Sequence, residues 1–364
     1  MKWILSFFIA ASLQAAPQQF AIDLAEAIDK PSDNWVFSPY SIANCLSLVA
    51  EGAEGATAAE IQNIMPPLSS MDTHPHLFQL HLAQGVWVHE GTQLLPGYVN
   101  LLHSISASIE AVPFNPQTVE AINQWISDRT ENKITHLFNP SDLGPLTRIV
   151  LANALYFKGD WSHPFDPSET KDRPFHPSKN RTYATPSLHT QGRFDYYEDK
   201  EIQAVSLPFK ADPADPIQPA CLLILPKQDG MELSHLSVEL IGHLHPQAVS
   251  IQVPKFTFDL RLSLLDALKK LGIHSAFSTQ ADFSKISNEK NLYLSDVLHK
   301  SYFSFSELGV EAAAATGAVF KVTSIYPKPA AIPFIADHPF YFLVYDRNSQ
   351  TILFFGQVRD PQNE

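Results

Sequence analysis

Residues 307–316 read ELGVEAAAAT, a run of mostly small residues with no aromatic side chain. Alanine by itself favours a helix, but the flanking sequence favours a strand. Residues 301–306 alternate aromatic and small polar side chains, and β-branched residues and three prolines follow the run. The sequence therefore predicts a strand that continues into a long exposed loop, residues 308–333.

The order of side chains within this loop limits what it can become. Alternate positions share one face when a segment is extended as a strand. One set is uncharged and mostly apolar: Val310, Ala312, Ala314, Thr316, Ala318, Phe320 and Val322. The other set contains the charged residues Glu311 and Lys321. A permanent surface loop does not need this division, so we expect a loop that can enter a β-sheet as an additional strand.

Four segments, in order along the chain, resemble motifs of one family, the serpins. Residues 37–42 (FSPYSI) resemble the start of the family's second helix, and residues 153–161 (NALYFKGDW) resemble the third strand of its main sheet. Residues 307–316 resemble the proximal hinge of its reactive-centre loop, and residues 334–344 (FIADHPFYFLV) resemble the signature beyond that loop. The resemblance implies an α+β fold: a single domain with three β-sheets, a ring of helices and an exposed reactive-centre loop.

Local patterns also predict helices mixed with strands and no regular βαβ repeat, which is typical of α+β proteins. Helices are predicted from a capping box at Thr57 and Glu60 ending near Met65, from the spacing of Val119, Ile122, Trp125 and Ile126, and over Ser263–Leu271 with Gly272 at its end. Strands are predicted over Ile149–Phe157, as a central strand covered on both faces, and as a hairpin of Phe340–Val344 and Thr351–Val358.

The first 15 residues have the features of a secretory signal peptide. Lys2 gives a positive end, residues 3–13 are mostly apolar, and Ala15 ends a small-residue cleavage site. The alternative is a buried first helix. Since no segment has the 18 or so uninterrupted apolar residues of a membrane span, we expect residues 16–364 to be a soluble domain, secreted to an extracellular or periplasmic space.

The formal net charge of −13 disfavours nucleic acids and anionic membranes as partners. The two cysteines, Cys45 and Cys221, lie in apolar helical and strand segments. We expect separate buried thiols, with a disulfide as the alternative. Asn180 and Thr182 belong to a glycosylation sequon, which is otherwise a surface turn.

Motifs for catalysis and for cofactors are missing. The sequence has no nucleophile elbow, zinc-protease helix, Walker loop or dinucleotide fingerprint, so we expect neither an enzyme nor a cofactor. The closest group of histidines is His74, His76 and His81, but Pro75 breaks the helix that metal-ligand spacing would need. We expect these histidines to be solvated or hydrogen-bonded and to hold no metal.

Four polar residues lie in apolar surroundings: Ser38, Ser41, Asn153 and His299. On their own they indicate local caps and core hydrogen bonds. The resemblance implies that they form the family's shutter, a polar cluster beneath the place where the main sheet opens. His299 would then hold strands together through neutral hydrogen bonds that rearrange on insertion. We do not interpret the cluster as a hydrolase triad.

A second group, Glu307, Lys255 and Trp161, matches the family's breach, where the loop first enters the sheet. On its own the Glu307–Lys255 pair would be a surface ion pair worth less than about 1 kcal/mol. The resemblance favours a latch at the start of the insertion path.

One part of the chain departs from the family pattern. Between Met65 and Trp87 the family often carries a basic helix that binds sulfated polysaccharides. This span has no lysine or arginine. We therefore predict that the helix is shortened or absent, and that heparin-like polymers do not activate the protein.

The resemblance implies an irreversible, suicide-type protease inhibitor. A protease would cleave the loop, form an acyl-enzyme and be trapped as the hinge inserts into the main sheet. The hinge residues would be Gly309, Val310, Glu311, Ala312, Ala313, Ala314, Ala315 and Thr316. The alternatives are a non-inhibitory serpin that acts as a binding, carrier or chaperone protein, and a secreted hydrolase, which lacks any nucleophile motif.

Counting from the two ends of the loop gives different cleavage sites. The proximal count points to the Thr323–Ser324 bond, and the distal count points to the Lys328–Pro329 bond. We prefer Thr323–Ser324, because the proximal count sets how much strand can insert, and a trypsin-like cut after Lys321 would leave that strand short. This bond predicts an elastase-like, subtilisin-like or papain-like target, a serine or cysteine protease, for a monomeric inhibitor.

Overall fold

The computed structural model describes residues 17–28, 34–66, 77–228, 240–310 and 330–362. Several sequence predictions lie outside these ranges: the signal peptide (residues 1–15), His74 and His76, the hinge residues 311–316, and the Thr323–Ser324 bond. Of the span predicted to lack a basic helix, residues 67–76 also lie outside, and the strand β2 begins at Phe78.

The α-helices of the described residues are α1 (Pro17–Ala27), α2 (Pro39–Gly52), α3 (Gly55–Ile64), α4 (Pro96–Ser104), α5 (Pro116–Arg129) and α6 (Leu265–Lys270). The helices α2 and α5 start in the same way. The Ser38 side chain accepts a hydrogen bond from the backbone N–H of Ser41, the Asn115 side chain accepts one from Thr118, and a proline follows each cap. α5 confirms the helix predicted from apolar spacing.

Two helix predictions need correction. The capping box at Thr57 and Glu60 is wrong: α3 begins after Glu54 and has no side-chain cap. The Thr57 hydroxyl accepts a hydrogen bond from the backbone N–H of Asp282 instead, and the Glu60 carboxylate accepts from the backbone N–H groups of residues 274 and 275. α6 begins two residues later than predicted, because Ser263 still pairs within a sheet. It ends as predicted, with the following glycine at φ +106°.

Within the described residues, six strands form the main sheet, in the order β10-β11-β12-β4-β2-β3. They are β10 (Phe256–Ser263), β11 (Leu294–Phe305), β12 (Gly309–Val310), β4 (Ile149–Asp160), β2 (Phe78–His89) and β3 (Ser108–Val112). β4 has neighbours on both edges, and its first nine residues are buried. This confirms the predicted central strand, whose near-continuous apolar sequence suits a strand covered on both faces.

The other strands form a nine-stranded ladder: β1 (Trp35–Phe37), β5 (Lys171–Ser178), β6 (Arg181–Glu198), β7 (Ile202–Pro208), β8 (Pro219–Pro226), β9 (His245–Pro254), β13 (Ile332–Ile335), β14 (Phe340–Asp346) and β15 (Ile352–Val358). One part contains β1, β15, β14, β8 and β7, and the other contains β5, β6, β9 and β13. Among the described strands, the end of β6 joins them through four pairs with β7. The α+β class is confirmed, with the main sheet and these two parts as its three sheets.

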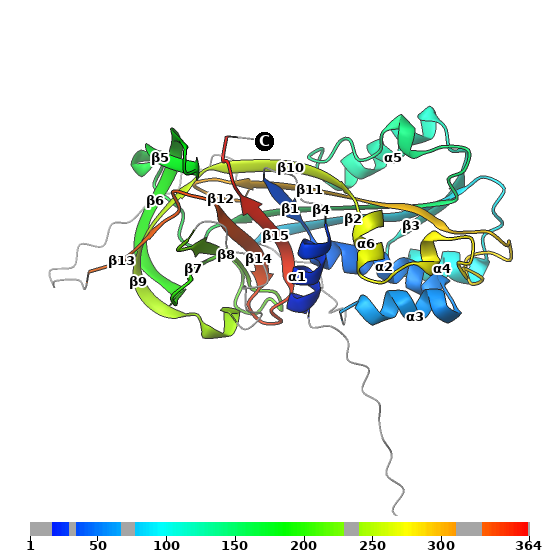
Figure 1. Ribbon diagram of the computed structural model, residues 1–364, viewed down its shortest axis with the longest axis horizontal. Helices are drawn as coiled ribbons and strands as arrows, with labels where there is room; N and C mark the ends of the chain where they lie inside the picture. Colours follow the sequence, from blue (N-terminus) through cyan, green and yellow to red (C-terminus); the bar gives the residue numbers. More distant parts are fainter. Residues whose placement is uncertain (1–16, 29–33, 67–76, 229–239, 311–329, 363–364) are drawn as a thin grey trace, which may run out of the picture.

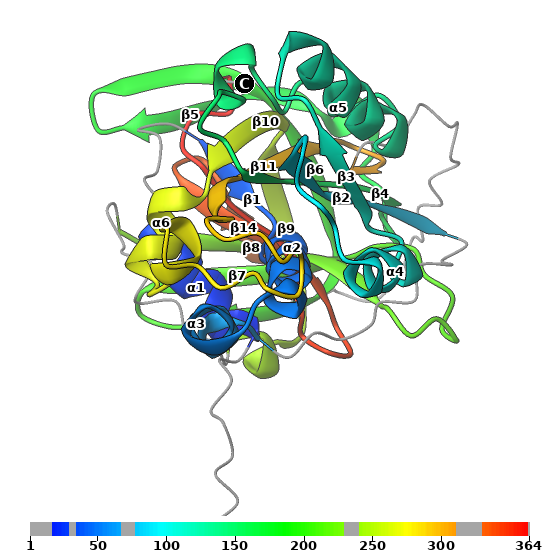
Figure 2. The same ribbon diagram turned by 90° about the vertical axis from the view of Figure 1, so that its right-hand side faces the viewer.

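Helices cover both faces of the main sheet (Figure 1). On one side, α5 packs on β2, and its Val119, Ile122 and Ile126 belong to a cluster that also contains residues of β4 and β11. On the other, a larger apolar cluster joins the sheet to α1, α2, α3, α4 and α6. The strands β5, β6, β9 and β13 lie at the left end of the molecule in Figure 1, and β1, β14 and β15 lie near its middle. Figure 2 shows the β5–β6 hairpin reaching away from the body.

The cysteine prediction is confirmed, because Cys45 and Cys221 are both buried and unbonded. Burial raises the pKa of the Cys45 thiol to about 12, which leaves it in the unreactive protonated form. The sequon residue Asn180 lies, as expected, in the exposed turn between β5 and β6. Among the described residues there is no metal-ligating cluster and no helix long and apolar enough to span a membrane.

Candidate functional site: the seam between β4 and β11

The site is the line along which two parallel strands meet, which we call the seam. β4 and β11 pair through eight positions, from Ile149 beside Leu294 to Tyr156 beside Tyr302. Beyond this point the strands part and the two-residue strand β12 lies between them, antiparallel to both. A parallel pair inside a sheet is the one arrangement that can admit a strand antiparallel to both neighbours.

β12 consists of the first two predicted hinge residues. Gly309 pairs with Asp160, and Val310 pairs with Gly159 on one side and Phe305 on the other. Val310 is fully buried. A Cβ atom added to Gly309 would lie 2.0 Å from the carbonyl oxygen of Gly159. The backbones meet so closely here that only glycine fits, and this part of the predicted exposed loop is in fact inside the sheet.

The predicted breach residues lie together at this open end. The Glu307 carboxylate is 3.0 Å from the Lys255 ammonium and accepts a hydrogen bond of 3.1 Å from the Thr170 hydroxyl. Partial burial alone would raise the pKa of Glu307, but the hydrogen bond and the charge of Lys255, together with the Thr170 contact, lower it below its ordinary value. The carboxylate therefore stays charged at neutral pH and holds the end of β11 to the segments before β5 and β10.

Trp161 fixes the same segment from the side of β4. Its indole N–H donates to the carbonyl oxygen of Ser306 at 2.9 Å, and its backbone N–H donates to that of Leu308 at 2.8 Å. Its ring stacks on Phe209, with centroids 4.4 Å apart, and lies 5.0 Å from the Phe305 ring. The short turn between β11 and β12 is thus held by directed bonds and by apolar packing.

The predicted shutter residues also lie together, in the middle of the seam. Asn153 of β4 and His299 of β11 are directly paired in the sheet. The Asn153 side-chain oxygen is 2.6 Å from His299 Nδ1 and accepts a 2.7 Å hydrogen bond from the Ser41 hydroxyl. The Asn153 amide donates to the carbonyl oxygen of Ser41 at 2.8 Å. Asn153 therefore ties the two strands to each other and to the start of α2.

His299 must be neutral in this network. Its Nδ1 atom faces an acceptor and so carries the proton, while Nε2 accepts from the Ser38 backbone N–H at 3.0 Å and from the Ser301 hydroxyl at 2.7 Å. A second proton would sit on Nε2, against the N–H of Ser38. Complete burial lowers the pKa of His299 to about 3, so the neutral ring persists over the whole physiological range.

This cluster cannot act as a hydrolase site. Ser38, Ser41, Asn153, His299 and Ser301 all have 0% exposure, so no substrate bond reaches them. The Nδ1–H of His299 points at an amide oxygen and not at a carboxylate, which removes the usual support for a general base. The hydrogen bonds of this cluster can hold β4 and β11 together, and they can break when the strands separate.

A further segment crosses the opposite face of the seam. Residues 134–142, which we call the strap, connect α5 to β4 and bury Ile134, Leu137 and Phe138 in a cluster with Ala152 of β4 and Leu298 of β11. Directed bonds hold it there. The Asn123 side-chain oxygen of α5 accepts from the backbone N–H groups of strap residues 137 and 138, both at 2.9 Å.

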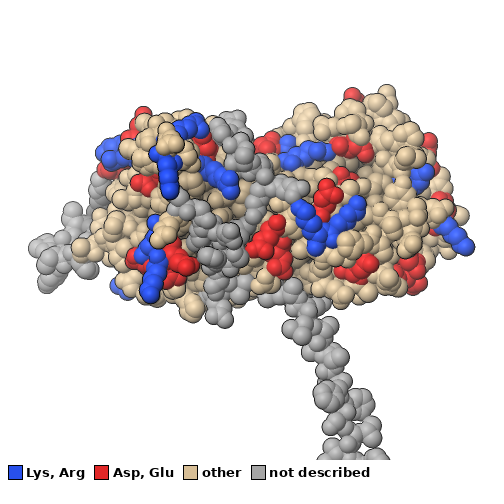
Figure 3. Space-filling view, viewed as in Figure 1, with Lys and Arg blue, Asp and Glu red and all other residues tan. Residues whose placement is uncertain are grey.

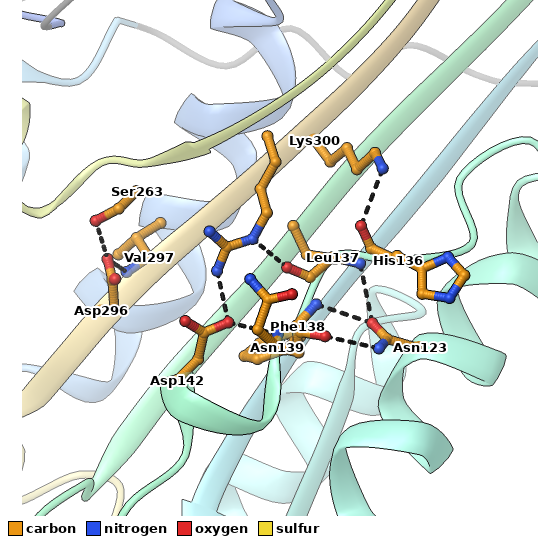
Figure 4. A network of polar contacts seen from close by, with 11 residues as sticks. Asn123, His136, Leu137, Phe138, Asn139, Asp142, Ser263, Asp296, Val297 and Lys300 are labelled. Carbon is orange, nitrogen blue, oxygen red and sulfur yellow. Dashed lines mark hydrogen bonds and ion pairs between the residues drawn. The ribbon is translucent and has the colours of Figure 1, made fainter. Parts of the chain in front are cut away.

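Two cations fasten the strap to the sheet (Figure 4). Lys300 of β11 donates to the carbonyl oxygen of His136 at 3.0 Å. Arg261 of β10 donates to the carbonyl oxygen of Leu137 and pairs with the Asp142 carboxylate. A strand entering the seam would have to separate β11 from β4 beneath this strap.

Sequence reasoning missed the strap and its two cations, as well as Thr170, Ser301 and Ser306 at the other contacts. One signal was present: Lys300 is a lysine within the buried middle of β11, and only 8% of it is exposed. A buried lysine must have partners. Finding those partners requires the tertiary structure.

Comparison with known proteins agrees with this arrangement. The family model for Serpin (serine protease inhibitor) matches residues 15–361. The chain belongs to the serpin family. Members of this family are in general protease inhibitors and not enzymes.

Two relatives illustrate how far the serpin similarity extends. An uncharacterized serpin-like protein of Thermococcus kodakarensis is 34% identical over 375 residues, which cover 96% of this chain and 85% of that protein. Neuroserpin of Gallus gallus is 30% identical over 368 residues, 92% of this chain and 87% of that protein. The similarity therefore includes the seam, the strap and both ends of the loop.

Solved serpin structures agree with the fold. Serpin48 of the insect Tenebrio molitor superposes with a TM-score of 0.80 at 28% identity, over 94% of this chain and 96% of that one. Human thyroxine-binding globulin, solved in a complex with thyroxine, gives a TM-score of 0.82 at 26% identity, over 95% of this chain and 97% of that one. The same fold thus occurs in a serpin described as highly specific and in a thyroxine-binding protein.

Proposed function

We propose that this serpin is an irreversible, suicide-type protease inhibitor, which acts by cleavage of its reactive loop, trapping of the acyl-enzyme and insertion of the loop into the main sheet. The observation that carries this proposal is β12. Gly309 and Val310 lie between β4 and β11, antiparallel to both, at the end where the seam is open. The next residues along the chain are mostly small. Those at alternate positions, which would share one face of an extended strand with Val310, carry no charge.

Insertion would extend a strand that has already begun. Each further residue would exchange the β4–β11 pairing for two new antiparallel edges, and each additional backbone hydrogen bond contributes about 1 kcal/mol net. Val310, Ala312, Ala314 and Thr316 would occupy one face and bring no charge into the core. Separation of the seam at the shutter and beneath the strap would provide the kinetic barrier that delays the change until the loop is cut.

We propose Thr323–Ser324 as the bond that is attacked, and an elastase-like, subtilisin-like or papain-like protease as the partner. The distance from β12 supports this choice. Cleavage after Thr323 frees 13 residues beyond Val310, enough at about 3.3 Å per residue to run the length of β4. We further propose that residues 1–15 direct export, that the mature chain is a monomer, and that it requires no heparin-like activator.

The test is to mix the purified protein with one protease of each class and with the same proteases blocked at the active site. We expect a covalent complex that survives SDS with at least one active protease and with none of the blocked ones. Mass analysis of the released C-terminal peptide should give a fragment that begins at Ser324. Cleaved protein should also melt at a clearly higher temperature than intact protein.

The non-inhibitory alternative deserves the same experiment, because thyroxine-binding globulin and ovalbumin share this fold. A carrier or storage serpin would be cut in the loop without forming a complex with any protease. Its melting temperature would not rise if the loop failed to insert. Clean cleavage by all three protease classes would therefore contradict the inhibitor proposal and favour the alternative.

A further inference from the structure

The β5–β6 hairpin is a basic segment in an acidic protein. Between Lys171 and Phe194 there are five lysine or arginine residues and one acidic residue, whereas the whole chain has a net charge of −13. All five cations are exposed. In the space-filling view, lysine and arginine side chains gather at the end of the molecule where Figure 1 labels β5 (Figure 3).

Most of these charges have no ion-pair partner among the residues that the structure describes. Arg181 is the exception: it pairs with the Asp360 carboxylate at 2.6 Å, and Asp360 is only 3% exposed. Lys171 lies 3.7 Å from Glu169, but both side chains are well exposed, so this pair holds little energy. Within the described residues, Arg173, Lys179 and Arg193 have no carboxylate within ion-pair distance. We call Lys171, Arg173, Lys179 and Arg193 the basic hairpin.

The hairpin lies next to the residue where the reactive loop begins. Lys171 directly follows Thr170, whose hydroxyl donates to Glu307 at 3.1 Å. On β6, the carbonyl oxygen of Pro186 accepts from the backbone N–H of Lys255, the partner of Glu307. The base of the hairpin therefore contacts the breach, four residues before the undescribed part of the loop starts.

The far end of the loop is also near. β9 pairs with β6 on one edge and with β13, the first strand after the loop, on the other. Gly192 of β6, Val249 and Ile332 of β13 lie in one row, so Arg193 is in the next row, two strand spacings or about 10 Å from β13. The described segments on both sides of the loop, β12 and β13, therefore lie near this hairpin.

We propose that the basic hairpin is a docking surface for an acidic patch on the target protease, beside its active-site cleft. This inference rests on the proposed function, since it concerns the partner that attacks the same loop. Exposed, uncompensated charges beside a reactive segment steer an oppositely charged partner and raise its association rate. A long polyanion fits less well, because the rest of the chain is strongly acidic and would repel whatever extended past the hairpin.

The experiment measures how fast the loop is cut, which does not depend on whether the protease is then trapped. The test variant carries Lys171→Glu, Arg173→Glu, Lys179→Glu and Arg193→Glu. Arg181 stays unchanged, because Asp360 needs it. The matched control is Lys290→Glu, an exposed lysine beyond the other end of β11. The proteases are the elastase-, subtilisin- and papain-type enzymes, at about 20 mM and about 0.5 M salt.

For the protease that cuts the wild type fastest, we expect the charge-reversed hairpin to slow loop cleavage at least about tenfold at low salt and less than about twofold at high salt. Lys290→Glu should have no such effect. The yield of covalent complex per cleaved loop should not change, since the hinge and the shutter are untouched. The melting temperature of the variant should match the wild type.

Three outcomes would overturn the docking proposal: an unchanged rate with every protease, an equal slowing by Lys290→Glu, or a slowing that persists at high salt. The surface would be assigned to a polyanion instead if two results came together. The charge reversal would abolish binding of a sulfated polysaccharide, and it would leave the rate of loop cleavage unchanged. The two proposals can also fail separately. If the wild type forms no covalent complex, but the charge-reversed hairpin still slows loop cleavage at low salt only, the inhibitor mechanism is rejected and the docking surface is kept.

Discussion

The open end and the middle of the seam are held in different ways. At the open end, β12 already separates β4 from β11, and the holding contacts are a partly exposed ion pair and the Trp161 bonds. In the middle, β4 and β11 pair directly, and the completely buried side chains of His299 and Asn153 hydrogen-bond both strands to the start of α2. Separating β4 from β11 therefore costs less free energy at the breach than at the shutter.

The most severe way to break this contrast is Val310→Arg. Its side chain occupies a position with no exposure, where an unpaired charge costs several kcal/mol. We expect the arginine to be expelled from the sheet, so that β12 no longer forms. The yield of covalent complex should then fall at least about tenfold, the equivalent of about 1.4 kcal/mol or more. Complex yield is read on SDS gels, with Val310→Ala as the control. A yield equal to that of the alanine variant would reject the hinge assignment.

The shutter is tested by Asn153→Ala. This change leaves His299 Nδ1–H and the Ser41 hydroxyl without their acceptor in a buried site, at a cost of about 1–3 kcal/mol for each unsatisfied group. The apparent melting temperature of the intact protein should fall by several degrees. Asn180→Ala, in the exposed turn between β5 and β6, is the matched control. Equal melting temperatures for the two variants would show that the network does not hold the seam.

A pH series sharpens the comparison, because His299 lies in the middle of the seam and the open end has no such histidine among its described contacts. The pKa of His299 is about 3 in the folded protein and near 6.5 when exposed. The unfolded chain therefore takes up the proton first as the pH falls. The stabilisation is complete above pH 6.5 and declines below it, with a slope of up to about 1.4 kcal/mol per pH unit.

The measurement for this prediction is the denaturant midpoint of unfolding from about pH 7 to about pH 4, compared between wild type and His299→Gln. Carboxylates with lowered pKa values, Glu307 among them, also lose their contribution as the pH falls. They are common to both proteins and cancel in the difference. Parallel pH profiles for the two proteins would contradict the assignment.

The smallest expected effect is at the breach. Glu307→Gln keeps the hydrogen-bonding shape and removes the charge opposite Lys255, whose side chain is 42% exposed. Solvent screens such a pair, so we expect a loss of less than about 1 kcal/mol. A double-mutant cycle with Lys255→Met, read by chemical unfolding, gives the coupling. A coupling energy of several kcal/mol between Glu307 and Lys255 would contradict the view that the open end of the seam is held more weakly than its middle.

Regular local patterns were predicted well. The central strand β4, the helix α5 and the β14–β15 hairpin follow directly from the spacing of apolar residues and from turn residues. The capping box failed for a tertiary reason: the side chains of Thr57 and Glu60 bind backbone N–H groups more than 200 positions away, and these compete with the local cap. A single sequence does not carry that competition.

The candidate site depended on a different kind of information. Ser38, Asn153 and His299 are separated by more than 100 residues, and nothing in their spacing brings them together; only the resemblance to a family placed them in one cluster. The structure then supplied what the resemblance lacked, such as the protonation of His299 and the bond from Trp161 to Ser306. The strap was missed because its anchors, Arg261 among them, look like ordinary strand cations in the sequence.

The position of Trp161 has a practical consequence. Its indole is almost completely buried, and its N–H bonds to the carbonyl oxygen of Ser306, three residues before β12. Any event that moves this turn changes the hydrogen bonding and the surroundings of the ring. The chain has five tryptophans, so the difference in emission between the wild type and Trp161→Phe isolates the signal of this ring. That signal should report, without a label and in real time, when the loop leaves its starting position.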